Sequence, residues 1–218
     1  MQKKGITCTS AVEMIADGAT LMIGGFMSVG APHRLIEELI RQRKKNLTVI
    51  SNDTGRPGIG IGKLIDAKLV KKVIASHIGT NPETQRQVIA GELEAILTPQ
   101  GTLAEQIRCA GFGLGGVLTT TGIGTTVGEG KQLVEVNGKQ YLLELPLRAD
   151  FALLAAHRSD YRGNLEYSLT ARNFNAVMAV AADCVIAEPE HIVPMGVIAP
   201  DNVVTPFCCV DYIVERCN

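Results

Sequence analysis

The 218-residue sequence contains no tryptophan and few other aromatic residues, with five Phe and four Tyr. It therefore offers no series of aromatic side chains on which nucleic-acid bases could stack. The sequence also lacks an excess of positive charge, because 21 Lys and Arg residues stand against 22 Asp and Glu residues and give a net charge of −1. Nucleic-acid binding usually requires a basic excess. We expect no nucleic-acid partner.

Long apolar segments are absent as well. A membrane-spanning helix needs about 18 or more consecutive apolar residues, and the apolar runs in this sequence are far shorter. The first ten residues, MQKKGITCTS, have two lysines but no apolar run behind them, unlike a secretory signal peptide. With 46% hydrophobic and 20% charged residues, the composition is that of a folded chain. We expect a soluble, cytoplasmic, globular protein that does not associate with membranes.

Cysteine and histidine are present without the spacing of a metal site. The six cysteines include no CxxC pair and no Cys/His cluster at zinc-binding spacing, so we predict reduced thiols. They are Cys8, Cys109, Cys184, Cys208, Cys209 and Cys217. The four histidines lie in unrelated segments, and we expect surface or capping roles for them and no bound metal. They are His33, His77, His157 and His191.

Short apolar runs alternate with helical patterns along most of the chain. Runs that are apolar without polar alternation predict strands that are buried on both faces, as in a parallel sheet. The predicted strands cover 19–23, 47–51, 72–75, 93–97, 149–156 and 185–187, with an extended segment at 210–214. The predicted helices cover 10–16 (with Ser10 as N-cap), 32–45, 61–66, 82–90, 102–109 and 174–182. This alternation predicts one α/β domain over 1–218 with a mainly parallel, open central sheet flanked by helices.

The alternation is interrupted between 111 and 143. Residues 111–130 are rich in Gly and Thr and have no helical period. Two alternating runs, 131–136 and 139–143, then flank Asn137-Gly138. An Asn-Gly pair in this setting strongly favours a hairpin with a type I′ turn. We predict a hairpin excursion from the α/β pattern at about 131–143.

Glycine, with 23 residues, exceeds its average frequency of about 7%, and the loop after the first predicted strand is rich in it. This loop reads Gly24-Gly25-Phe26-Met27-Ser28-Val29-Gly30. In an open α/β sheet, ligands bind at the carboxyl ends of the strands. Glycines permit positive φ and close backbone approach, and the following helix presents free N–H groups to an anion. The pattern favours a binding loop, with a tight packing turn as the alternative.

The common nucleotide and hydrolase motifs do not fit this loop. Gly24 and Gly25 are adjacent, which excludes G-x-G-x-x-G, and the chain contains no Gly-Lys-Ser/Thr triplet. Ser28 lacks the glycine two positions earlier that a nucleophile elbow requires. No carboxylate lies in a sequence context typical of a catalytic acid, base or nucleophile. The candidate site therefore looks incomplete.

Longer motifs resemble family I coenzyme A transferases. Residues 17–32, DGATLMIGGFMSVGAP, are similar position by position to the first signature of that family. Further segments at 50–54, 74–84, 98–108, 118–125 and 171–175 resemble its α subunits, so that the resemblance covers most of the chain. The likeness is strongest to the α subunits of bacterial enzymes that act on acetate, acetoacetate or butyrate.

The resemblance implies transfer of CoA between a short-chain acyl-CoA and a short-chain carboxylic acid. In that family a glutamate attacks the thioester, and a glutamyl-CoA intermediate follows, which is covalent catalysis by a carboxylate. The glutamate belongs to a Ser-Glu-Asn-Gly motif of the β subunit, and this chain does not contain that motif. The resemblance thus implies a β-subunit partner, in an α₂β₂ assembly, and CoA as a substrate component with no permanently bound cofactor.

The resemblance also implies roles for particular residues. Gln100 matches a glutamine whose amide faces the thioester carbonyl, where it would stabilise an oxyanion; a helix N-terminal residue bonded to its own turn is the alternative. The segment Gly24 to Gly30 matches the segment that contacts CoA. Asn52 and Ser76, at predicted strand ends, are candidates for holding the carboxylate acceptor.

Two other functions are open at this point. A non-catalytic acyl-CoA or metabolite sensor could have kept the binding loop, but it would need an effector module, for which we expect no spare length. A sugar-phosphate isomerase-like enzyme would need its own carboxylate base in a strand-end loop, and no convincing one is found.

Overall fold

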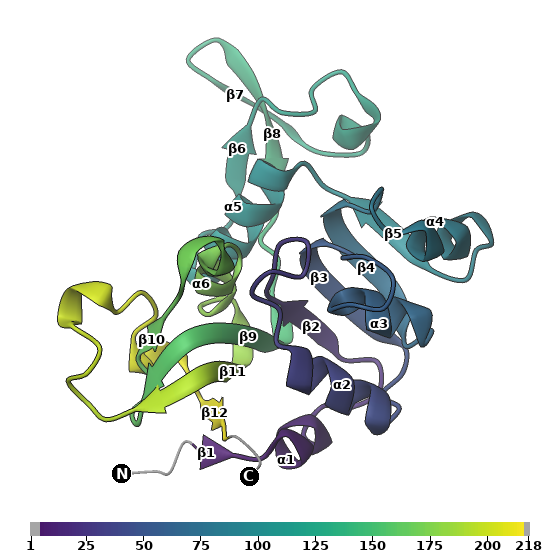
Figure 1. The fold of residues 1–218 in the computed structure, drawn as a ribbon. Helices are drawn as coiled ribbons and strands as arrows, with labels where there is room; N and C mark the ends of the chain where they lie inside the picture. Colours follow the sequence, from purple (N-terminus) through teal and green to yellow (C-terminus); the bar gives the residue numbers. More distant parts are fainter. Residues whose placement is uncertain (1–4, 216–218) are drawn as a thin grey trace.

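A long, mostly parallel sheet runs through the part of the chain that this computed structural model describes, residues 5–215 (Figure 1). Its strand order within those residues is β1-β12-β11-β9-β2-β3-β4-β5, and β10 is attached to β9. Every pairing along that order is parallel, whereas β10 runs antiparallel to β9. The prediction of an α/β fold with a mainly parallel central sheet is confirmed.

The elements have the following bounds. The strands of the long sheet are β1 (Gly5–Ile6), β2 (Thr20–Ile23), β3 (Leu47–Asp53), β4 (Val70–His77), β5 (Glu94–Leu97), β9 (Ala149–Asp160), β10 (Leu165–Glu166), β11 (Ala182–Val193) and β12 (Tyr212–Val214). The helices are α1 (Cys8–Glu13), α2 (His33–Arg41), α3 (Ile61–Asp66), α4 (Pro82–Ile89), α5 (Gln100–Gly111) and α6 (Asn175–Met178). Short 3-10 turns are η1 (Thr126–Gly128), η2 (Leu169–Arg172), η3 (Pro200–Asn202) and η4 (Phe207–Cys209).

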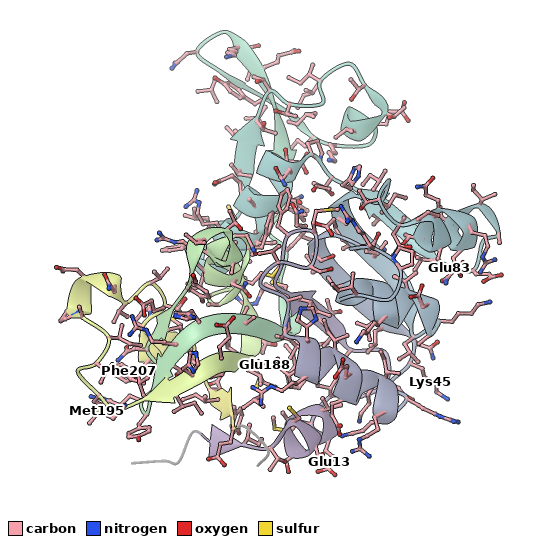
Figure 2. All side chains as sticks on the ribbon, viewed as in Figure 1. Glu13, Lys45, Glu83, Glu188, Met195 and Phe207 are labelled. Carbon is pink, nitrogen blue, oxygen red and sulfur yellow. The ribbon has the colours of Figure 1, made fainter. Side chains whose placement is uncertain are left out.

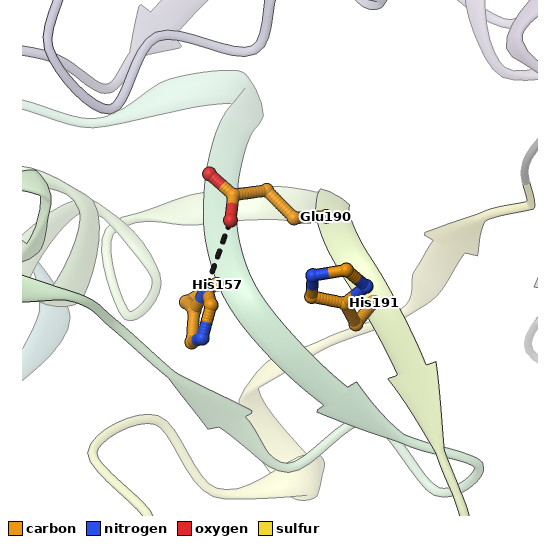
Figure 3. Close-up of side chains that lie close together, drawn as sticks. All are labelled: His157, Glu190 and His191. Atoms are coloured by element: carbon orange, nitrogen blue, oxygen red, sulfur yellow. Dashed lines mark hydrogen bonds and ion pairs between the residues drawn. The ribbon is translucent and has the colours of Figure 1, made fainter.

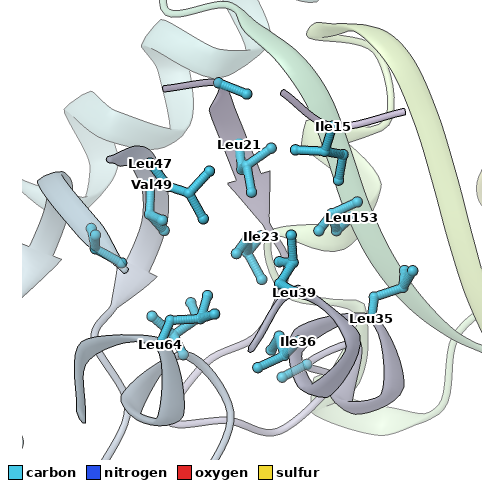
Figure 4. Close-up of a cluster of buried hydrophobic side chains, with 14 of the residues drawn as sticks. Ile15, Leu21, Ile23, Leu35, Ile36, Leu39, Leu47, Val49, Leu64 and Leu153 are labelled. Atoms are coloured by element: carbon cyan, nitrogen blue, oxygen red, sulfur yellow. The ribbon is translucent and has the colours of Figure 1, made fainter. Parts of the chain in front are cut away.

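Apolar side chains cover both faces of the long sheet. Alternate residues of a strand point to opposite faces, so Leu21 and Ile23 of β2 pack with Leu39 of α2 in one cluster (Figure 4). Met22, between them, packs with Leu103 of α5 in the other. Burial on both faces is the reason that β2 has no polar alternation. Charged side chains such as Lys45 lie at the periphery (Figure 2).

A separate antiparallel sheet lies above the long sheet in Figure 1. It consists of β6 (Val117–Thr119), β8 (Lys139–Glu144) and β7 (Leu133–Val136), in that order. Asn137 and Gly138, between β7 and β8, have φ values of 51° and 74°, as a type I′ turn requires. The predicted hairpin is confirmed, and β6 is a strand that the Gly/Thr-rich pattern did not predict.

Several predicted boundaries were wrong. The N-cap of α1 is Thr7, whose hydroxyl accepts a hydrogen bond from the Ser10 amide at 3.1 Å, so the helix begins before Ser10. The helix expected at 174–182 is limited to α6. Strands β9 and β11 extend over 12 residues each, beyond 149–156 and 185–187, because they pair with each other through polar segments that carry no apolar pattern.

The N-terminus of α2 obtains its hydrogen bonds from a distant strand. Pro32 precedes the helix and provides no side-chain cap. The Glu188 carboxylate on β11 accepts hydrogen bonds from the backbone amides of Arg34 and Leu35 at 3.1 and 2.8 Å. A carboxylate is favourable there because the first turn of a helix has unpaired N–H groups and a positive dipole end. Figure 2 shows Glu188 on β11, facing α2.

The helices and the cysteines bear on two further expectations from the sequence. Among residues 5–215, no helix combines the length and the apolar character that crossing a membrane would need. Cys109, Cys184 and Cys208 carry free thiols, and Cys217 lies outside the described residues.

Candidate active site

Three loops and one helix start meet at the carboxyl edge of the long sheet. Strands β2, β3, β4 and β5 are consecutive neighbours and parallel, so their carboxyl ends share one edge. The glycine loop, Gly24 to Gly30, follows β2, and α5 begins after β5. This edge is where an open α/β sheet binds its ligands.

The glycine loop is a tight hairpin with a strained tip. Phe26 and Val29 exchange backbone hydrogen bonds at 3.0 and 2.9 Å. Between them, Met27 and Ser28 have φ values of 50° and 70°. The left-handed region costs a residue with a side chain roughly 1–2 kcal/mol, and such strain persists where the surroundings enforce it, often at functional sites. The side chains of Phe26 and Val29 are exposed on this loop.

A buried carboxylate holds the loop from the β3 side. Asp53 is 4% exposed, and its Oδ2 accepts a hydrogen bond from the Met27 amide at 2.8 Å. Its Oδ1 accepts from the Gly55 amide at 2.7 Å, and the Asn52 side-chain amide donates to Oδ2 at 2.6 Å. Hydrogen bonds to an ionised acceptor are about twice as strong as neutral ones. Asp53 therefore fixes the strained tip against the end of β3.

Two asparagines hold the same loop from the other side. Asn173 accepts from the Gly25 amide at 3.2 Å and donates to the Val29 carbonyl at 2.9 Å. Asn175 donates to the Gly30 carbonyl at 2.9 Å. Both asparagines fall in the segment 171–175 that resembles the family. The sequence analysis predicted no role for them or for Asp53. The only available signal was the motif itself, because the contacts of the two asparagines join residues 144 to 148 positions apart and leave no local pattern.

Gln100, Asn52 and Ser76 are brought together as the strand-end positions suggested. Gln100 is the first residue of α5, its side chain is exposed, and its Nε2 donates to Asn52 Oδ1 at 2.5 Å. The Ser76 hydroxyl donates to the Asn52 backbone carbonyl at 2.7 Å. Asn52 is 2% exposed, and its amide group is bonded at both its oxygen and its nitrogen. This burial favours a role for Asn52 in orienting Gln100 over direct contact with a substrate.

A cavity of about 250 Å³ joins the glycine loop to Gln100. It is lined by Phe26, Gln100, Ala104, Asn173, Phe174 and Val177. Among these described residues there is an amide donor, but no carboxylate, thiol or imidazole that could act as a nucleophile or base. The arrangement can orient a ligand and stabilise a negative charge on it, while the attacking group has to come from elsewhere.

Comparison with known proteins shows the family of the chain. A model of the coenzyme A transferase family matches residues 6–216. The chain belongs to the coenzyme A transferase family. Within it, the chain is 54% identical over 214 residues to the acetate CoA-transferase subunit alpha of Escherichia coli K12, covering 98% of this chain and 97% of that protein.

A second sequence relative and a solved structure are also coenzyme A transferases. The chain is 48% identical over 216 residues to the acetoacetyl-CoA:acetate/butyrate CoA transferase alpha subunit of Clostridium acetobutylicum, with 99% of each chain covered. Among solved structures, an acyl-CoA transferase from E. coli O157:H7, in a thioester complex with CoA, superposes with a TM-score of 0.87 at 25% identity. That match covers 99% of this chain and 47% of the other, so this chain spans about half of that enzyme. The sensing and isomerase alternatives receive no support from these relatives.

Proposed function

We propose that this chain is the α subunit of a heteromeric CoA-transferase. It moves CoA between a short-chain acyl-CoA and a short-chain carboxylic acid such as acetate, acetoacetate or butyrate. The observation that carries the proposal is the position of Gln100, which is exposed, oriented by Asn52, and shares a cavity with the glycine loop. The family membership and the two α-subunit relatives support the same reaction class.

Gln100 is proposed to stabilise the oxyanion of the tetrahedral intermediate. A glutamine side chain carries two N–H donors, and one of them is used by Asn52. The other can donate to the thioester oxygen as a carboxylate attacks the carbonyl carbon and negative charge develops on that oxygen. A neutral amide donates without exchanging a proton, and one such donor is worth about 2.7–4 kcal/mol in comparable sites.

The glycine loop is proposed to contact CoA. Asp53, Asn173 and Asn175 hold its backbone in one conformation, so little ordering remains to be done when the ligand binds. The exposed Phe26 side chain lines the cavity together with Gln100 and would lie against the CoA thioester arm. Ser76 is proposed to support the acceptor carboxylate region through Asn52.

The nucleophile is proposed to be a glutamate of a β subunit. No residue lining the 250 Å³ cavity of the described chain can attack a thioester. A partner glutamate would form first a mixed anhydride and then glutamyl-CoA, from which the acceptor carboxylate takes CoA. An α₂β₂ assembly would provide two such sites.

The test is an assay of CoA transfer from acetoacetyl-CoA to acetate. The chain without a β subunit should show no transfer, and the chain co-expressed with a β subunit should be active. In that complex, Gln100→Ala should lower kcat by roughly 10²–10³, whereas Gln140→Ala, at an exposed position of the hairpin strand β8, should leave it unchanged.

Two results would contradict the proposal. Full activity of the chain without a partner would show that it contains its own nucleophile. A Gln100→Ala complex as active as the Gln140→Ala complex would remove Gln100 from oxyanion stabilisation.

A further inference from the structure

Three potential metal ligands lie close together near the carboxyl ends of the two longest strands, β9 and β11. They are His157 on β9 and Glu190 and His191 on β11 (Figure 3). Each offers one ligand atom, and these atoms all lie within 4.8 Å of one another. His157 Nδ1 is 2.8 Å from Glu190 Oε2, and the two imidazole rings are 5.6 Å apart at an angle of 89°. The residues lie 33 or more positions apart in the sequence except for the adjacent pair on β11.

Strand pairing determines this convergence. β9 and β11 are parallel, with Ala156 opposite Pro189 and Arg158 opposite His191. His157 therefore lies beside Glu190, in the middle of a ladder that continues on both sides. Because the backbone positions are set by paired strands rather than by a loop, the ligand atoms are held close before any ion binds.

We propose that His157, Glu190 and His191 bind a divalent transition-metal ion, with Zn²⁺ as the best fit. Two imidazole nitrogens and one carboxylate oxygen form a ligand set that suits zinc and its neighbours. Mg²⁺ and Ca²⁺ prefer oxygen ligands alone, so they should bind far more weakly. Without a metal, His157 and Glu190 form a hydrogen-bonded pair, and the ion would replace the proton between them.

A cavity beside the cluster gives the ion access and room for a further ligand. It measures about 470 Å³, and its lining includes His157, Glu190, Arg34 and the loop residues Val29 and Gly30. The side chains of His157 and Glu190 are 35% and 66% exposed, so an ion can enter from solvent. With three protein ligands, zinc keeps a coordination position for water or an anionic oxygen, and that position would face this cavity. The proposal does not depend on the transferase function.

The test is a calorimetric titration of the full chain with ZnCl₂, and of its complex with a β subunit. The protein should carry no polyhistidine tag, and CoA should be absent because its thiol also binds zinc. We expect saturable binding of one Zn²⁺ per chain and visible absorption bands when Co²⁺ replaces zinc. Binding should weaken as the pH falls, because protons compete for the imidazole nitrogens, and Mg²⁺ should not compete.

Matched variants separate the cluster from the rest of the cavity. Glu190→Gln and His157→Asn should each lower zinc affinity at least as much as loss of an outer-shell partner does, roughly 10–100-fold. His33 lines the same cavity but lies outside the cluster. The His33→Asn variant should therefore bind zinc as the unsubstituted chain does. Circular dichroism and thermal melting without metal establish that each variant is folded.

Three outcomes would overturn the proposal. They are the absence of saturable zinc binding, zinc binding of equal strength in folded Glu190→Gln and His157→Asn chains, and equal displacement of zinc by Mg²⁺. In each case the three side chains would be a surface hydrogen-bonded group and no metal site.

Discussion

At the scale of single residues, the Asp53 carboxylate links two loops that follow different strands. Its two oxygens accept hydrogen bonds from the backbone amides of Met27 and Gly55. Without Asp53, these two amides would lose that acceptor. A buried N–H without an acceptor costs about 1–3 kcal/mol. This cost explains how Met27 is kept in a left-handed conformation that its side chain disfavours.

We predict that Asp53→Asn disrupts the glycine loop. One carboxylate oxygen becomes an NH₂ group, which faces a backbone N–H instead of accepting from it. The free energy of unfolding should fall by about 1.5–3 kcal/mol, and in the complex with a β subunit the KM for acyl-CoA should rise. Urea denaturation and steady-state kinetics measure the two effects. Asp201→Asn, on an exposed 3-10 turn, is the control. Equal unfolding free energies and equal KM values for the two variants would contradict the role of Asp53 in holding the glycine loop.

Glu38 provides a pH-dependent contribution to stability. Its buried carboxylate accepts hydrogen bonds from Arg41 Nε and Gln42 Nε2, both at 2.7 Å. The hydrogen bond from Arg41, with help from Gln42, lowers the pKa of Glu38 to about 2. Because the pKa is lower in the folded chain, the charged form stabilises the fold above the unfolded pKa of about 4.3. That contribution is lost as the pH falls towards 2.

We therefore predict that Glu38→Gln lowers the free energy of unfolding by about 1 kcal/mol at pH 7, a value reduced by solvent screening because Arg41 is 62% exposed. The difference from the unsubstituted chain should shrink between about pH 4.5 and pH 2. Urea denaturation across that range measures it. Glu37→Gln removes an exposed ion pair with Lys63 and should cost under about 0.5 kcal/mol. A Glu38→Gln effect that does not change with pH would show that charge is not its cause.

At the scale of elements, the glycine loop tolerates no side chain at its first position. A Cβ on Gly24 would lie 1.8 Å from Oδ1 of Asn175, a residue that also holds the Gly30 carbonyl. Gly24 is favoured because the Asn175 side chain, which hydrogen bonds to Ala155 N, Gly30 O and Ala171 O hold in place, occupies the position of a Cβ. Met27 and Ser28, at the tip, show that positive φ alone does not impose glycine in this loop.

We predict that Gly24→Ala destabilises the fold by about 1–3 kcal/mol, the usual cost of overpacking, and lowers transfer activity in the complex. Gly115→Ala is the matched control, because a Cβ there meets nothing within 4 Å and its φ is not positive. Its stability should stay within about 0.5 kcal/mol of the unsubstituted chain. Thermal melting compares the two variants, and equal melting temperatures would refute the close contact.

Local signals predicted many elements well. Helix α3 was predicted with the bounds that the structure has, 61–66, and Asn137-Gly138 predicted the β7–β8 turn. Strands β1 and β6 were not predicted, because each is only two or three residues long. Their pairing partners, β12 and β8, lie elsewhere in the chain. A short strand is stabilised by its partner, and a partner far along the chain leaves no local pattern.

At the scale of the whole molecule, the two sheets should differ in local stability. The sheet of β6, β8 and β7 has mostly exposed or half-exposed residues, whereas β2 and β9 lie inside the long sheet between two apolar clusters. Segments with little buried apolar surface open without global unfolding. We predict that amides of β8 exchange with deuterium faster than those of β2 and β9. Exchange measured by mass spectrometry on the full chain tests this, and equal protection would indicate one cooperative unit.

The order of strands also explains how Asn173 and Asn175 come to hold the glycine loop. The chain returns after β8 to place β9 beside β2, with Leu21 opposite Phe151. The segment after β9 and β10 then brings Asn173 and Asn175 against a loop nearly 150 residues earlier. The same return pairs β9 with β11 and brings His157 to Glu190.

The fold class, the glycine loop, the hairpin turn and the family can all be predicted from the residues, because each depends on adjacent residues or on a contiguous motif. The strand ends also marked Asn52 and Ser76 as candidates, and the resemblance to the family marked Gln100. Which of these side chains touch is visible only once the sheet is assembled. The contacts of Gln100 with Asn52, of Asp53 with Met27 and of His157 with Glu190 all follow from strand order and register. These are set by packing of the whole sheet, so no local pattern of residues encodes them.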